Sequence, residues 1–557
     1  MVLADLLAGR PVLPHAAPLR ALAALAAALP CCLDEACTTP GVLTPLVLGA
    51  VFEAAIVRKP GGVFYTDADV AYTIARATIV PALLDASGVP GDSTDAQITA
   101  GGDLLAYTHT LIAAADASFA ERLRTAIDTI TVFDPTCGAG ALLLAALAVL
   151  EPLATACDAR LGRSITPAQR RVALITGALH GGDLSPEAVA LCALRLELAA
   201  AALGAHLPAL PHLRVADALA AVPDARYYPV IIGNPPYVTV RAAALPADLV
   251  TRGCGNLCAP VIERGLARLA AGGRFGMIVP TAVVSTRAMA PLRALLARHT
   301  VWHSHYAVRP ARLFAGVDMN LTITLLRSAP GAQHSTGYQR WSGAAARAAV
   351  LANPRYTALP PLPADAALPR LGHAQDVRIY TVLRAQPHTI ADLHDITGVP
   401  IYYHSGGRYW RKALRAPLSS HYKPLCVRPG ALPFALALLN SRVFHWWWIA
   451  HSNCMDVVTR DVLSLPIFDT RLHDPAPYTD ALAALFAGYA RGTQQRVRRG
   501  ARIRTTETNI DSSAALDAIL TLDRLLARAY GLAAADAAYL AQFDRPRLAP
   551  PRAPDGV

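Results

Sequence analysis

The chain has 557 residues, 54% of them hydrophobic, which predicts three or four domain-sized units with ample cores. Its net charge of +11, from 51 basic and 40 acidic residues, favours a polyanionic partner, although a GC-rich genome produces the same excess of arginine over lysine. We expect a soluble cytoplasmic protein without a membrane span or signal peptide, because charged residues interrupt the longest apolar run (Arg195, Glu197) and the first residues (Asp5, Arg10).

The N-terminal half divides into two patterns. Residues 1–60 are rich in alanine and leucine with helical periodicity, so we expect a helical N-terminal region. From residue 61 to about 330, strand-like and helical patterns alternate, which is typical of a doubly wound α/β sheet. Within this segment, residues 86–102 are rich in Gly, Asp, Ser and Thr and predict a surface loop.

The turn Asp134-Pro135-Thr136-Cys137-Gly138-Ala139-Gly140 lies between a β-rich run, Ile130–Phe133, and an apolar helical run, Ala141–Leu150. A strand, a small-residue turn and a helix build nucleotide-cofactor sites, because glycines let the backbone approach the ligand closely. The turn lacks Gly-Lys-Ser/Thr and the Gly-x-Gly-x-x-Gly spacing, which argues against a triphosphate and weakens the case for a dinucleotide. A plain tight turn is the alternative.

Acidic residues follow at two further predicted strand ends, Asp183 and Asp217. A carboxylate at the end of the second strand of such a fold can accept from both ribose hydroxyls of a cofactor. We expect Asp217 to accept from a cofactor amino group at the next strand end. Each residue alone is also typical of a helix cap.

The tetrapeptide Asn234-Pro235-Pro236-Tyr237 follows the apolar run Pro229–Gly233, so it is predicted to lie just past a buried strand, where open α/β folds place their chemistry. Two prolines stiffen the loop and present fixed acceptors. If the Asn234 side-chain oxygen and the Pro235 carbonyl each accept one hydrogen of a ring amino group, its nitrogen becomes more electron-rich, while Tyr237 stacks on the base. The electrophile would be a methyl sulfonium; a proline-stiffened strand exit without chemistry is the alternative.

Downstream patterns describe a second domain. Residues 240–260 predict a mobile loop, and proline-rich residues 353–369 predict a linker or the start of that domain. Residues 402–428 interleave aromatic and basic side chains and favour nucleic-acid contact over a solvated surface, whereas a second basic cluster, Arg491–Arg504, is open between the two. Trp446–Trp448 is predicted to pack inside the domain, with one indole free to reach a groove.

The ten cysteines include no pair of Cys-x-x-Cys elements, so we predict no disulfide framework and no metal. Cys254 and Cys258 are predicted to be two buried or loop thiols.

Taken together, these residues resemble the S-adenosylmethionine-dependent DNA adenine N6 methyltransferases. In that family's pattern, Asp134–Gly140 resembles motif I, Asp183 motif II, Asp217 motif III and Asn234–Tyr237 the catalytic motif IV. Gly61–Asp67 resembles the G-x-Y-Y-T-P cofactor motif that precedes motif I in gamma-ordered members; Asp67 replaces the usual proline, and Thr66 is expected to cap the following helix.

Weaker likenesses extend over residues 48–535. They are similar to the lead-in of Eco57I-type methylases (Leu48–Glu53 and Arg58–Gly61), to the strand after the catalytic loop (Gly273–Pro280), to parts of a TaqI-like target-recognition domain (Leu438–Ser441 and Leu465–Ile467) and to a closing helix (Leu522–Leu532). The resemblance implies a Rossmann-like doubly wound methyltransferase domain at 61–330, a separate α+β target-recognition domain at 331–545 and a disordered tail at 546–557.

The resemblance also implies roles for individual residues. The expected catalytic residues are Asn234, Pro235, Pro236 and Tyr237. The expected S-adenosylmethionine contacts are Phe64, Tyr65, Thr66, Asp134, Thr136, Cys137, Gly138, Gly140, Asp183, Leu184 and Asp217. The expected DNA contacts are Tyr402, Arg408, Tyr409, Trp410, Arg411, Lys412, Arg415 and Lys423. A second stacking side chain on the far face of the base is implied, for which Phe314 and Tyr306 are candidates.

The expected partner is double-stranded DNA in a basic cleft between the domains, with other subunits of a restriction-modification or phage-defence system as further partners. Three other functions compete. A fused nuclease is disfavoured, because only about 60 residues precede Phe64. A glutamine or RNA methyltransferase shares the tetrapeptide but commonly lacks so large a C-terminal module. A catalytically silent DNA-binding subunit also stays open.

Overall fold

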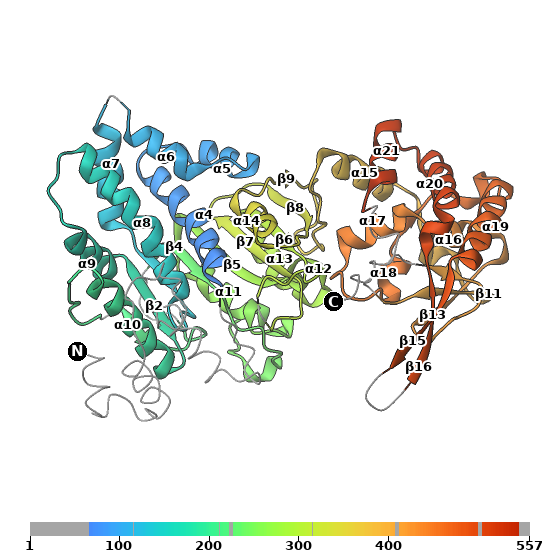
Figure 1. Cartoon of the computed structure of the whole chain (residues 1–557), viewed down its shortest axis with the longest axis horizontal. Coiled ribbons are helices and arrows are strands. Elements are labelled where there is room, and N and C mark those ends of the chain that lie inside the picture. The colour runs from blue at the N-terminus through green and yellow to red at the C-terminus, as the bar shows by residue number, and fades with distance from the viewer. Residues whose placement is uncertain are drawn as a thin grey trace. The chain divides into compact units, whose positions relative to one another are not determined.

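The computed structural model describes residues 66–544, apart from residues 115, 211, 222–226, 315, 407–411 and 500–503; the side chains of 496–499 and 504–507 also lie outside the description. The predicted helical region at 1–60 and the predicted tail at 546–557 therefore lie outside the described residues. The chain divides into two compact units, Met1–Ala367 and Leu368–Val557. Figure 1 shows both units and labels most of their helices and strands.

The first unit is built on a nine-stranded sheet with the order β3-β2-β1-β4-β5-β7-β6-β8-β9. The strands from β3 to β5 in this order are parallel, β7 is antiparallel to both β5 and β6, β8 is parallel to β6, and β9 is antiparallel to β8. The bounds are β1 Val132–Asp134, β2 Leu179–Asp183, β3 Leu213–Val215, β4 Tyr228–Gly233, β5 Leu269–Pro280, β6 Thr300–Tyr306, β7 Leu321–Arg327, β8 Gln333–Gln339 and β9 Thr357–Ala358.

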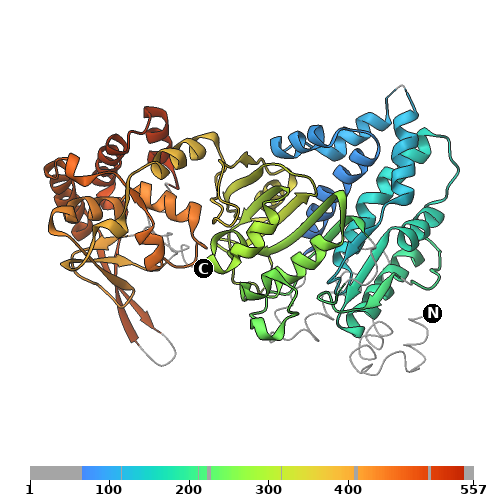
Figure 2. The same cartoon turned by 180° about the vertical axis from the view of Figure 1, so that it is seen from behind.

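Helices cover both faces of this sheet, as Figures 1 and 2 show from opposite sides. Val230 and Ile232 of β4 belong to the core under one set of helices, and Ile231 belongs to the core under the other set. Successive residues of a strand point to opposite faces, so an uninterrupted apolar run fits a strand that is covered on both sides. The predicted doubly wound α/β fold is confirmed.

The first face is covered by α4 (Ala68–Ala86), α7 (Ser118–Thr129), α8 (Ala141–Arg160) and α10 (Pro186–Ala201), and the second by α11 (Cys258–Ala267) and α13 (Ala290–Leu296). The unit also contains α5 Gly91–Ala100, α6 Leu104–Ile112, α9 Pro167–Gly177, α12 Ala282–Ser285, α14 Ala344–Ala352 and the 3₁₀ helices η2 Ala242–Ala244, η3 Val250–Cys254 and η4 Arg287–Met289. Among the described helices, α8 alone is long and apolar enough to cross a membrane, and most of it is buried inside the unit.

The surface loop predicted at 86–102 is wrong over most of its length, because Gly91–Ala100 forms helix α5. The helix ends at Gly101, whose φ of 70° is a left-handed conformation that glycine adopts at little cost. Its polar composition gives little local preference for a helix. Contacts between α5 and the sheet stabilise the helix despite this weak local preference.

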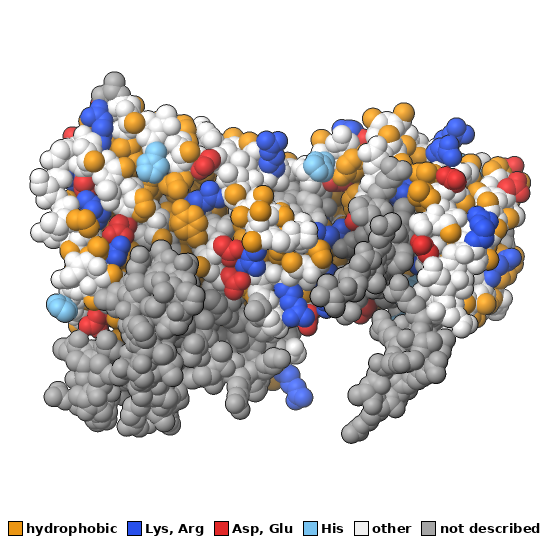
Figure 3. Space-filling model, viewed as in Figure 1, with side chains coloured by type: hydrophobic (Ala, Val, Ile, Leu, Met, Phe, Trp, Pro, Cys, Tyr) orange, Lys and Arg blue, Asp and Glu red, His pale blue; other side chains and the backbone are white. Residues whose placement is uncertain are grey.

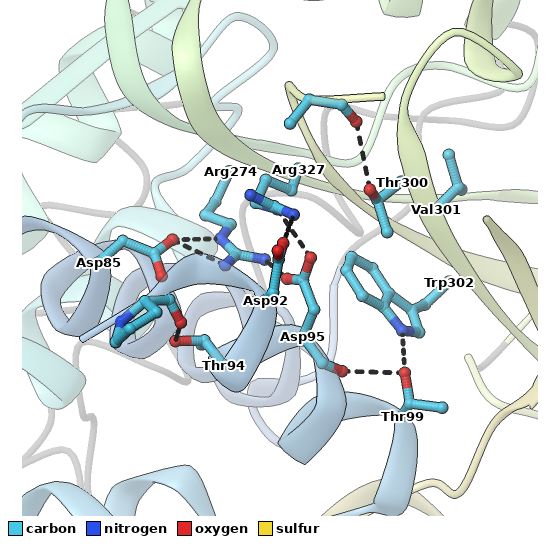
Figure 4. Close-up of polar contacts among 12 residues, drawn as sticks. Asp85, Asp92, Thr94, Asp95, Thr99, Arg274, Thr300, Val301, Trp302 and Arg327 are labelled. Atoms are coloured by element: carbon cyan, nitrogen blue, oxygen red, sulfur yellow. Dashed lines mark hydrogen bonds and ion pairs between the residues drawn. The ribbon is translucent and has the colours of Figure 1, made fainter. Parts of the chain in front are cut away.

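These contacts are ion pairs between α4, α5 and two strands (Figure 4). Arg274 on β5 donates to Asp85 at 2.7 and 2.9 Å and to Asp95 at 2.6 Å. Arg327 on β7 pairs with Asp92 at 2.6 Å and with Asp95 at 2.7 Å. Because Arg274 is 2% exposed, its charge is compensated by these carboxylates rather than by water.

The loop predicted at 240–260 contains the short helices η2 and η3, and an isolated bridge joins Thr239 to Asn256. Glu263 on α11 accepts hydrogen bonds from the backbone N–H groups of Val250 and Thr251 at 3.0 and 2.9 Å. The segment after β4 is therefore held to the following helix. Whether it moves stays a prediction.

The domain boundary predicted at 330 lies too early. Strands β8 and β9 follow that position and extend the large sheet, because Val301 to Tyr306 of β6 pair with Gln333 to Gln339 of β8. The division falls between Ala367 and Leu368, inside the proline-rich segment 353–369 that was predicted to be a linker or a domain start.

The second unit is α+β, as predicted. Its strands form three small sheets: β10 His388–Thr389 with β14 Pro466–Ile467; β11 His394–His404 between β12 Ala413–Leu414 and β13 Tyr422–Val427; and the hairpin β15 Thr493–Arg499 with β16 Arg504–Ile510. Its helices are α15 Ala374–Arg384, α16 Leu432–Leu439, α17 Arg442–His451, α18 Thr459–Leu463, α19 Ala476–Arg491, α20 Leu516–Tyr530 and α21 Ala534–Gln542, with 3₁₀ helices η5 Ile390–Leu393, η6 Pro429–Ala431, η7 Thr470–Leu472 and η8 Ser512–Ala515.

Helix α17 carries the tryptophan triplet Trp446–Trp448, and all three side chains are at most 3% exposed. The prediction that the triplet packs inside the domain is confirmed, and the prediction that one indole reaches a groove is wrong. Three consecutive residues cannot share one helix face. They are all buried because α17 is enclosed on every side, with Trp446 donating to Asp376 at 2.8 Å and Trp447 stacked on His451 at 3.7 Å.

Asn440 has a structural role in the same unit. Its amide donates to the carbonyl of Ala413 at 2.9 Å and accepts from the N–H of Ala413 at 3.1 Å, so it completes the ladder of the short strand β12. The segment predicted as a closing helix forms the C-terminal part of α20, which ends at Gly531 with a φ of 73°.

Candidate functional site

The candidate site is built from residues at the carboxyl ends of four neighbouring parallel strands. β1 ends at Asp134, β2 at Asp183, β3 two residues before Asp217, and β4 just before Asn234. The sheet order β3-β2-β1-β4 places these ends along one edge, with the direction of strand addition reversing between β1 and β4. Open α/β folds bind ligands at this position.

The residues Asp134–Gly140, here called the cofactor turn, form a tight backbone loop between β1 and α8. The Asp134 carboxylate accepts from the Thr136 N–H at 3.0 Å, and the Gly140 N–H donates to the Cys137 carbonyl at 2.8 Å. Gly138 and Gly140 have φ angles of 50° and 84°, which favour glycine. A Cβ at Gly140 would lie 2.6 Å from the sulfur of Cys192, so a larger residue does not fit there.

Helix α10 contacts the cofactor turn through Arg195 and Cys192. Arg195, which is 1% exposed, donates to the Ala139 carbonyl at 2.8 Å. Hydrogen bonding to Cys192 and burial raise the pKa of Cys137 well above its usual value, so this thiol is neutral. Sequence reasoning did not assign a role to Cys192 or to Arg195, although a charged residue inside an apolar helical run was a signal for the second.

Asp183 fixes the turn to the end of β2. One of its oxygens accepts from the Gly138 N–H and the other from the Ser185 N–H, both at 2.9 Å. Ser185 in turn caps α10 by accepting from the Ala188 N–H at 3.1 Å. A carboxylate oxygen has more than one acceptor site, so these bonds leave Asp183 able to accept from a ligand.

Asp134 is a buried carboxyl group that interacts with the charge of a second carboxyl group, Asp183. It is 1% exposed, and burial, with a contribution from the Asp183 charge, raises its pKa from 3.8 to about 8. Its Oδ2 atom has no hydrogen-bond partner among the described residues. A buried polar oxygen without a partner is costly, so the site fits a ligand that supplies one, and a positively charged ligand favours the ionised carboxylate.

Two other predicted cofactor residues lie near this edge. Leu184 follows Asp183 and is 73% exposed, which is unusual for a leucine side chain beside a buried strand. Asp217 is exposed and accepts from the Leu219 N–H at 2.8 Å, so in this structure it caps a turn. Neither arrangement prevents contact with a ligand at the strand ends.

Residues Asn234–Tyr237, here called the catalytic loop, leave the end of β4. The Asn234 amide nitrogen donates to the hydroxyl of Thr66 at 2.9 Å, and the Tyr237 hydroxyl donates to the Asn234 amide oxygen at 2.7 Å. The same hydroxyl lies 3.1 Å from the Ile278 carbonyl oxygen. Within this loop, Pro235 is buried and Pro236 is half-buried.

Tyr237 is 8% exposed, and burial raises its pKa well above its usual value. Its ring belongs to the core of the sheet unit, so the stacking role expected of it stays a prediction. Tyr306 and Phe314, the candidates for the far face of the base, are each 1% exposed. Because their rings lie within the same core, neither presents a stacking surface in this structure.

Thr66 does not cap α4 as predicted. The N-cap residue is Asp67, without a side-chain cap bond, and Asp67 pairs instead with Arg347 at 2.8 Å. The Thr66 hydroxyl accepts from Asn234. Phe64 and Tyr65, the other predicted residues of this segment, lie outside the described residues.

The predicted DNA contacts belong to the second unit and are only partly described. Arg415 and Lys423 are exposed, and Tyr402 and Lys412 are half-buried. Tyr402 on β11 pairs with Leu414 of β12 and with Pro424 of β13, and Lys412, Arg415 and Lys423 also lie on or beside these strands. Arg408, Tyr409, Trp410 and Arg411 lie outside the described residues.

The other basic residues predicted to contact nucleic acid lie in different structural settings. Arg428 donates to the Asp392 carbonyl at 2.8 Å and thus holds η5. The Arg491–Arg504 segment starts at the last residue of α19, includes strand β15 and ends at the first residue of β16. On the face seen in Figure 3, the described basic side chains are scattered among acidic and apolar ones rather than gathered in one patch.

Part of the sheet unit is similar to a known protein family. Residues 178–314 match the family model described as Eco57I restriction-modification methylase. The matched segment runs from β2 through the catalytic loop and beyond β6. No curated protein matches the sequence.

Two solved structures are similar to this chain, and the first of them shares its fold. The type IIL restriction-modification enzyme MmeI, in complex with DNA, is 11% identical with a TM-score of 0.52, over 82% of this chain and 77% of that chain. The ATP-dependent type ISP restriction-modification enzyme LlaBIII, bound to DNA, is 12% identical with a TM-score of 0.40, over 73% of this chain. This chain spans only 30% of the length of LlaBIII.

The matched segment includes three of the four strand ends of the site, with Asp183, Asp217 and Asn234, whereas Asp134–Gly140 precedes it. The match supports S-adenosylmethionine as the cofactor, as the resemblance implied. The resemblance drawn from the motifs is confirmed to this extent: residues 178–314 match the model of the Eco57I restriction-modification methylases.

Proposed function

We propose that this chain is a site-specific DNA methyltransferase that transfers a methyl group from S-adenosylmethionine to N6 of an adenine in double-stranded DNA. The observation that carries the proposal is the alignment of Asp134, Asp183 and Asn234 along one edge of the sheet, next to the strand reversal. The expected setting is a restriction-modification or phage-defence system in the cytoplasm.

S-Adenosylmethionine, when bound, supplies an electrophilic methyl group on a sulfonium that departs as a neutral thioether. The glycines of the cofactor turn let the backbone approach it closely. Asp134 offers a buried acceptor next to its positive charge, and Asp183 has acceptor sites for the ribose. The exposed Leu184 offers apolar surface for the adenine ring of the cofactor, and Asp217 an acceptor for its amino group.

In the proposed reaction, the Asn234 amide oxygen and the Pro235 carbonyl each accept one hydrogen of the target amine. This contact draws electron density onto N6, whose lone pair is otherwise delocalised into the ring. N6 forms a bond to the methyl carbon as the bond from that carbon to sulfur breaks, and N6 then loses one proton to solvent. The prolines restrict the backbone at positions 235 and 236, so once the base is bound the two acceptors need little reorganisation during methyl transfer. Tyr237 is proposed to stack on the base, which requires the loop to open around a ring that is 8% exposed.

The adenine inside a duplex has to leave the base stack to reach this loop. We propose that the second unit positions the DNA through Tyr402, Lys412, Arg415 and Lys423, together with Arg408–Arg411. Phosphate contacts fix the register, and base-edge contacts select the site. Other subunits of a restriction or defence system are proposed as further partners.

Two other functions fit part of the chemistry. One is methyl transfer to RNA or to a glutamine amide, because such a substrate presents a similar planar amine to the catalytic loop. A silent DNA-binding subunit needs no intact catalytic loop, and the hydrogen-bonded Asn234 argues against it. The methylated product distinguishes all three.

Replacement of Asn234 by alanine tests the proposal. We expect Asn234→Ala to abolish N6-adenine methylation, with at least about a hundredfold loss in kcat, because the oriented acceptor is removed. The measurements are long-read sequencing of DNA from expressing cells and nucleoside mass spectrometry.

The matched control is Asn353→Ala, which removes an exposed amide that contacts Arg76. We expect it to methylate like the wild type, and both variants to bind S-adenosylhomocysteine. Adenine methylation by Asn234→Ala contradicts the proposed mechanism. Methylation of another amine by the wild type contradicts the proposed substrate.

A further inference from the structure

The catalytic amide is held by residues from two distant parts of the sheet unit. Its nitrogen donates to Thr66, which lies 168 residues earlier, just before α4. Its oxygen accepts from Tyr237 within the catalytic loop. Thr66 is 6% exposed, so the bond to Asn234 is shielded from water.

The tyrosine hydroxyl has two acceptors within reach. It lies 2.7 Å from the Asn234 oxygen and 3.1 Å from the carbonyl oxygen of Ile278. A hydroxyl has one hydrogen, so Tyr237 satisfies one of these acceptors at a time. When the hydrogen turns to Ile278, the Asn234 oxygen exchanges its bond from Tyr237 for one from a substrate amine.

During that exchange, Thr66 keeps the amide in place. The two ends of an asparagine amide have nearly the same shape, but one accepts and the other donates. An amide that rotates by half a turn presents its NH₂ group to the substrate NH₂ group, and two donors repel each other. In the arrangement that the structure shows, the Asn234 nitrogen donates to Thr66 and the Asn234 oxygen accepts from Tyr237, so the bond to Thr66 holds the amide with its oxygen toward the tyrosine hydroxyl.

We propose that Thr66 is a positioning residue that orients the Asn234 amide for methyl transfer. The inference rests on the proposed function and adds a role beyond cofactor contact for the segment before α4. It assigns the hydroxyl, rather than the methyl group, as the part of Thr66 that acts on catalysis.

The test compares Thr66→Val, which keeps the shape and removes the hydroxyl, with Thr66→Ser, which keeps the hydroxyl. Methyl transfer from tritiated S-adenosylmethionine to bacterial genomic DNA that lacks adenine methylation gives kcat and KM. Titration calorimetry with S-adenosylhomocysteine gives cofactor-site binding independently of activity. Thermal melting reports whether each variant folds.

We expect Thr66→Val to lower kcat about ten- to a hundredfold, because the amide gains alternative orientations, and to change the Kd for S-adenosylhomocysteine less than about threefold. Thr66→Ser is expected to recover kcat to within about threefold of the wild type. A crystal structure of Thr66→Val is expected to show Asn234 in more than one orientation.

The matched control is Thr73→Val on α4. Thr73 is 8% exposed, and its hydroxyl donates to the Asp69 carbonyl of its own helix at 2.8 Å, so this change removes a comparable bond without affecting Asn234. Its kcat is expected to equal that of the wild type.

Two results overturn the proposal. One is a Thr66→Val enzyme with unchanged kcat and weaker S-adenosylhomocysteine binding, which assigns Thr66 to the cofactor alone. The other is a Thr66→Ser enzyme as slow as Thr66→Val, which assigns the effect to shape. If Thr66→Val does not melt cooperatively, Thr66→Ala carries the same comparison. The identity of the methylated product tests the proposed function separately, because the ratio of variant to wild-type rates applies to any amine.

Discussion

Asp134 is deeply buried and lies close to the negative charge of Asp183. Its carboxyl group is therefore expected to change protonation when a charged ligand binds. Its pKa is about 8, above the ordinary 3.8, because burial and the Asp183 charge disfavour the ionised form. Between these two pH values the folded protein holds a proton that the unfolded chain releases. The resulting stabilisation is complete below about pH 4 and is lost as the pH rises through about 8.

A positively charged ligand reverses this preference and expels the proton. We expect S-adenosylmethionine to bind more tightly as the pH rises from about 6 to 8, by up to about tenfold per pH unit, with no further gain above that range. Titration calorimetry at several pH values, in buffers of different ionisation enthalpy, measures the affinity and the proton released.

Asp134→Asn is the matched variant, since it keeps the shape of the side chain and cannot ionise. The amino group of the ligand titrates against both proteins, so the difference between them reports Asp134. We expect Asp134→Asn to bind more weakly and to lack the additional pH dependence. Equal pH profiles for the two proteins would show that Asp134 binds the cofactor as a neutral group.

At the scale of elements, the sequence predicts best where a local pattern and a tertiary position agree. The apolar run Pro229–Gly233 with its two prolines marks the end of β4, and the glycines of the cofactor turn mark the start of α8. Both signals are short and contiguous. The fold class and the edge that carries the site follow from them.

Features that depend on partners distant in sequence were missed. Helix α5 has weak local preference and depends on Arg274 and Arg327, more than 170 residues later. Strand β8 joins the sheet only through its pairing with β6, so composition placed the boundary too early. The bond from Asn234 to Thr66 and the burial of Tyr237 likewise arise from packing that no local pattern displays.

The ion pairs of α5 predict a large effect from one residue. We expect Arg274→Met to destabilise the sheet unit by about 3–5 kcal/mol, because Asp85 and Asp95 lose a buried cation that compensates them. Chemical denaturation followed by circular dichroism measures the change.

Arg471→Met is the control for charge removal. Arg471 is exposed and pairs with Asp469 on the surface of the second unit, so we expect no measurable change in the unfolding midpoint. If Arg274→Met and Arg471→Met unfold alike, the ion pairs do not hold α5 in place.

For the whole molecule, the question is whether the +11 charge acts as a general attraction or through defined contacts. A general attraction depends on net charge alone. Defined contacts depend on which cations are removed, because each phosphate contact releases counterions and adds to the salt dependence of binding. Arg415 and Lys423, on or beside the three-stranded sheet of the second unit, are exposed cations whose removal distinguishes the two possibilities.

We expect the double variant Arg415→Ala with Lys423→Ala to bind duplex DNA more weakly and to lower the slope of log Kd against log salt by about 1.8, from about 0.9 for each lost phosphate contact. Fluorescence anisotropy over a range of salt concentrations measures the slope. The control, Arg471→Ala with Arg524→Ala, removes the same charge from two other exposed positions. If both double variants lower the slope equally, the net charge attracts DNA without a defined contact at this sheet; if only the first does, β12 and β13 border the path of the DNA.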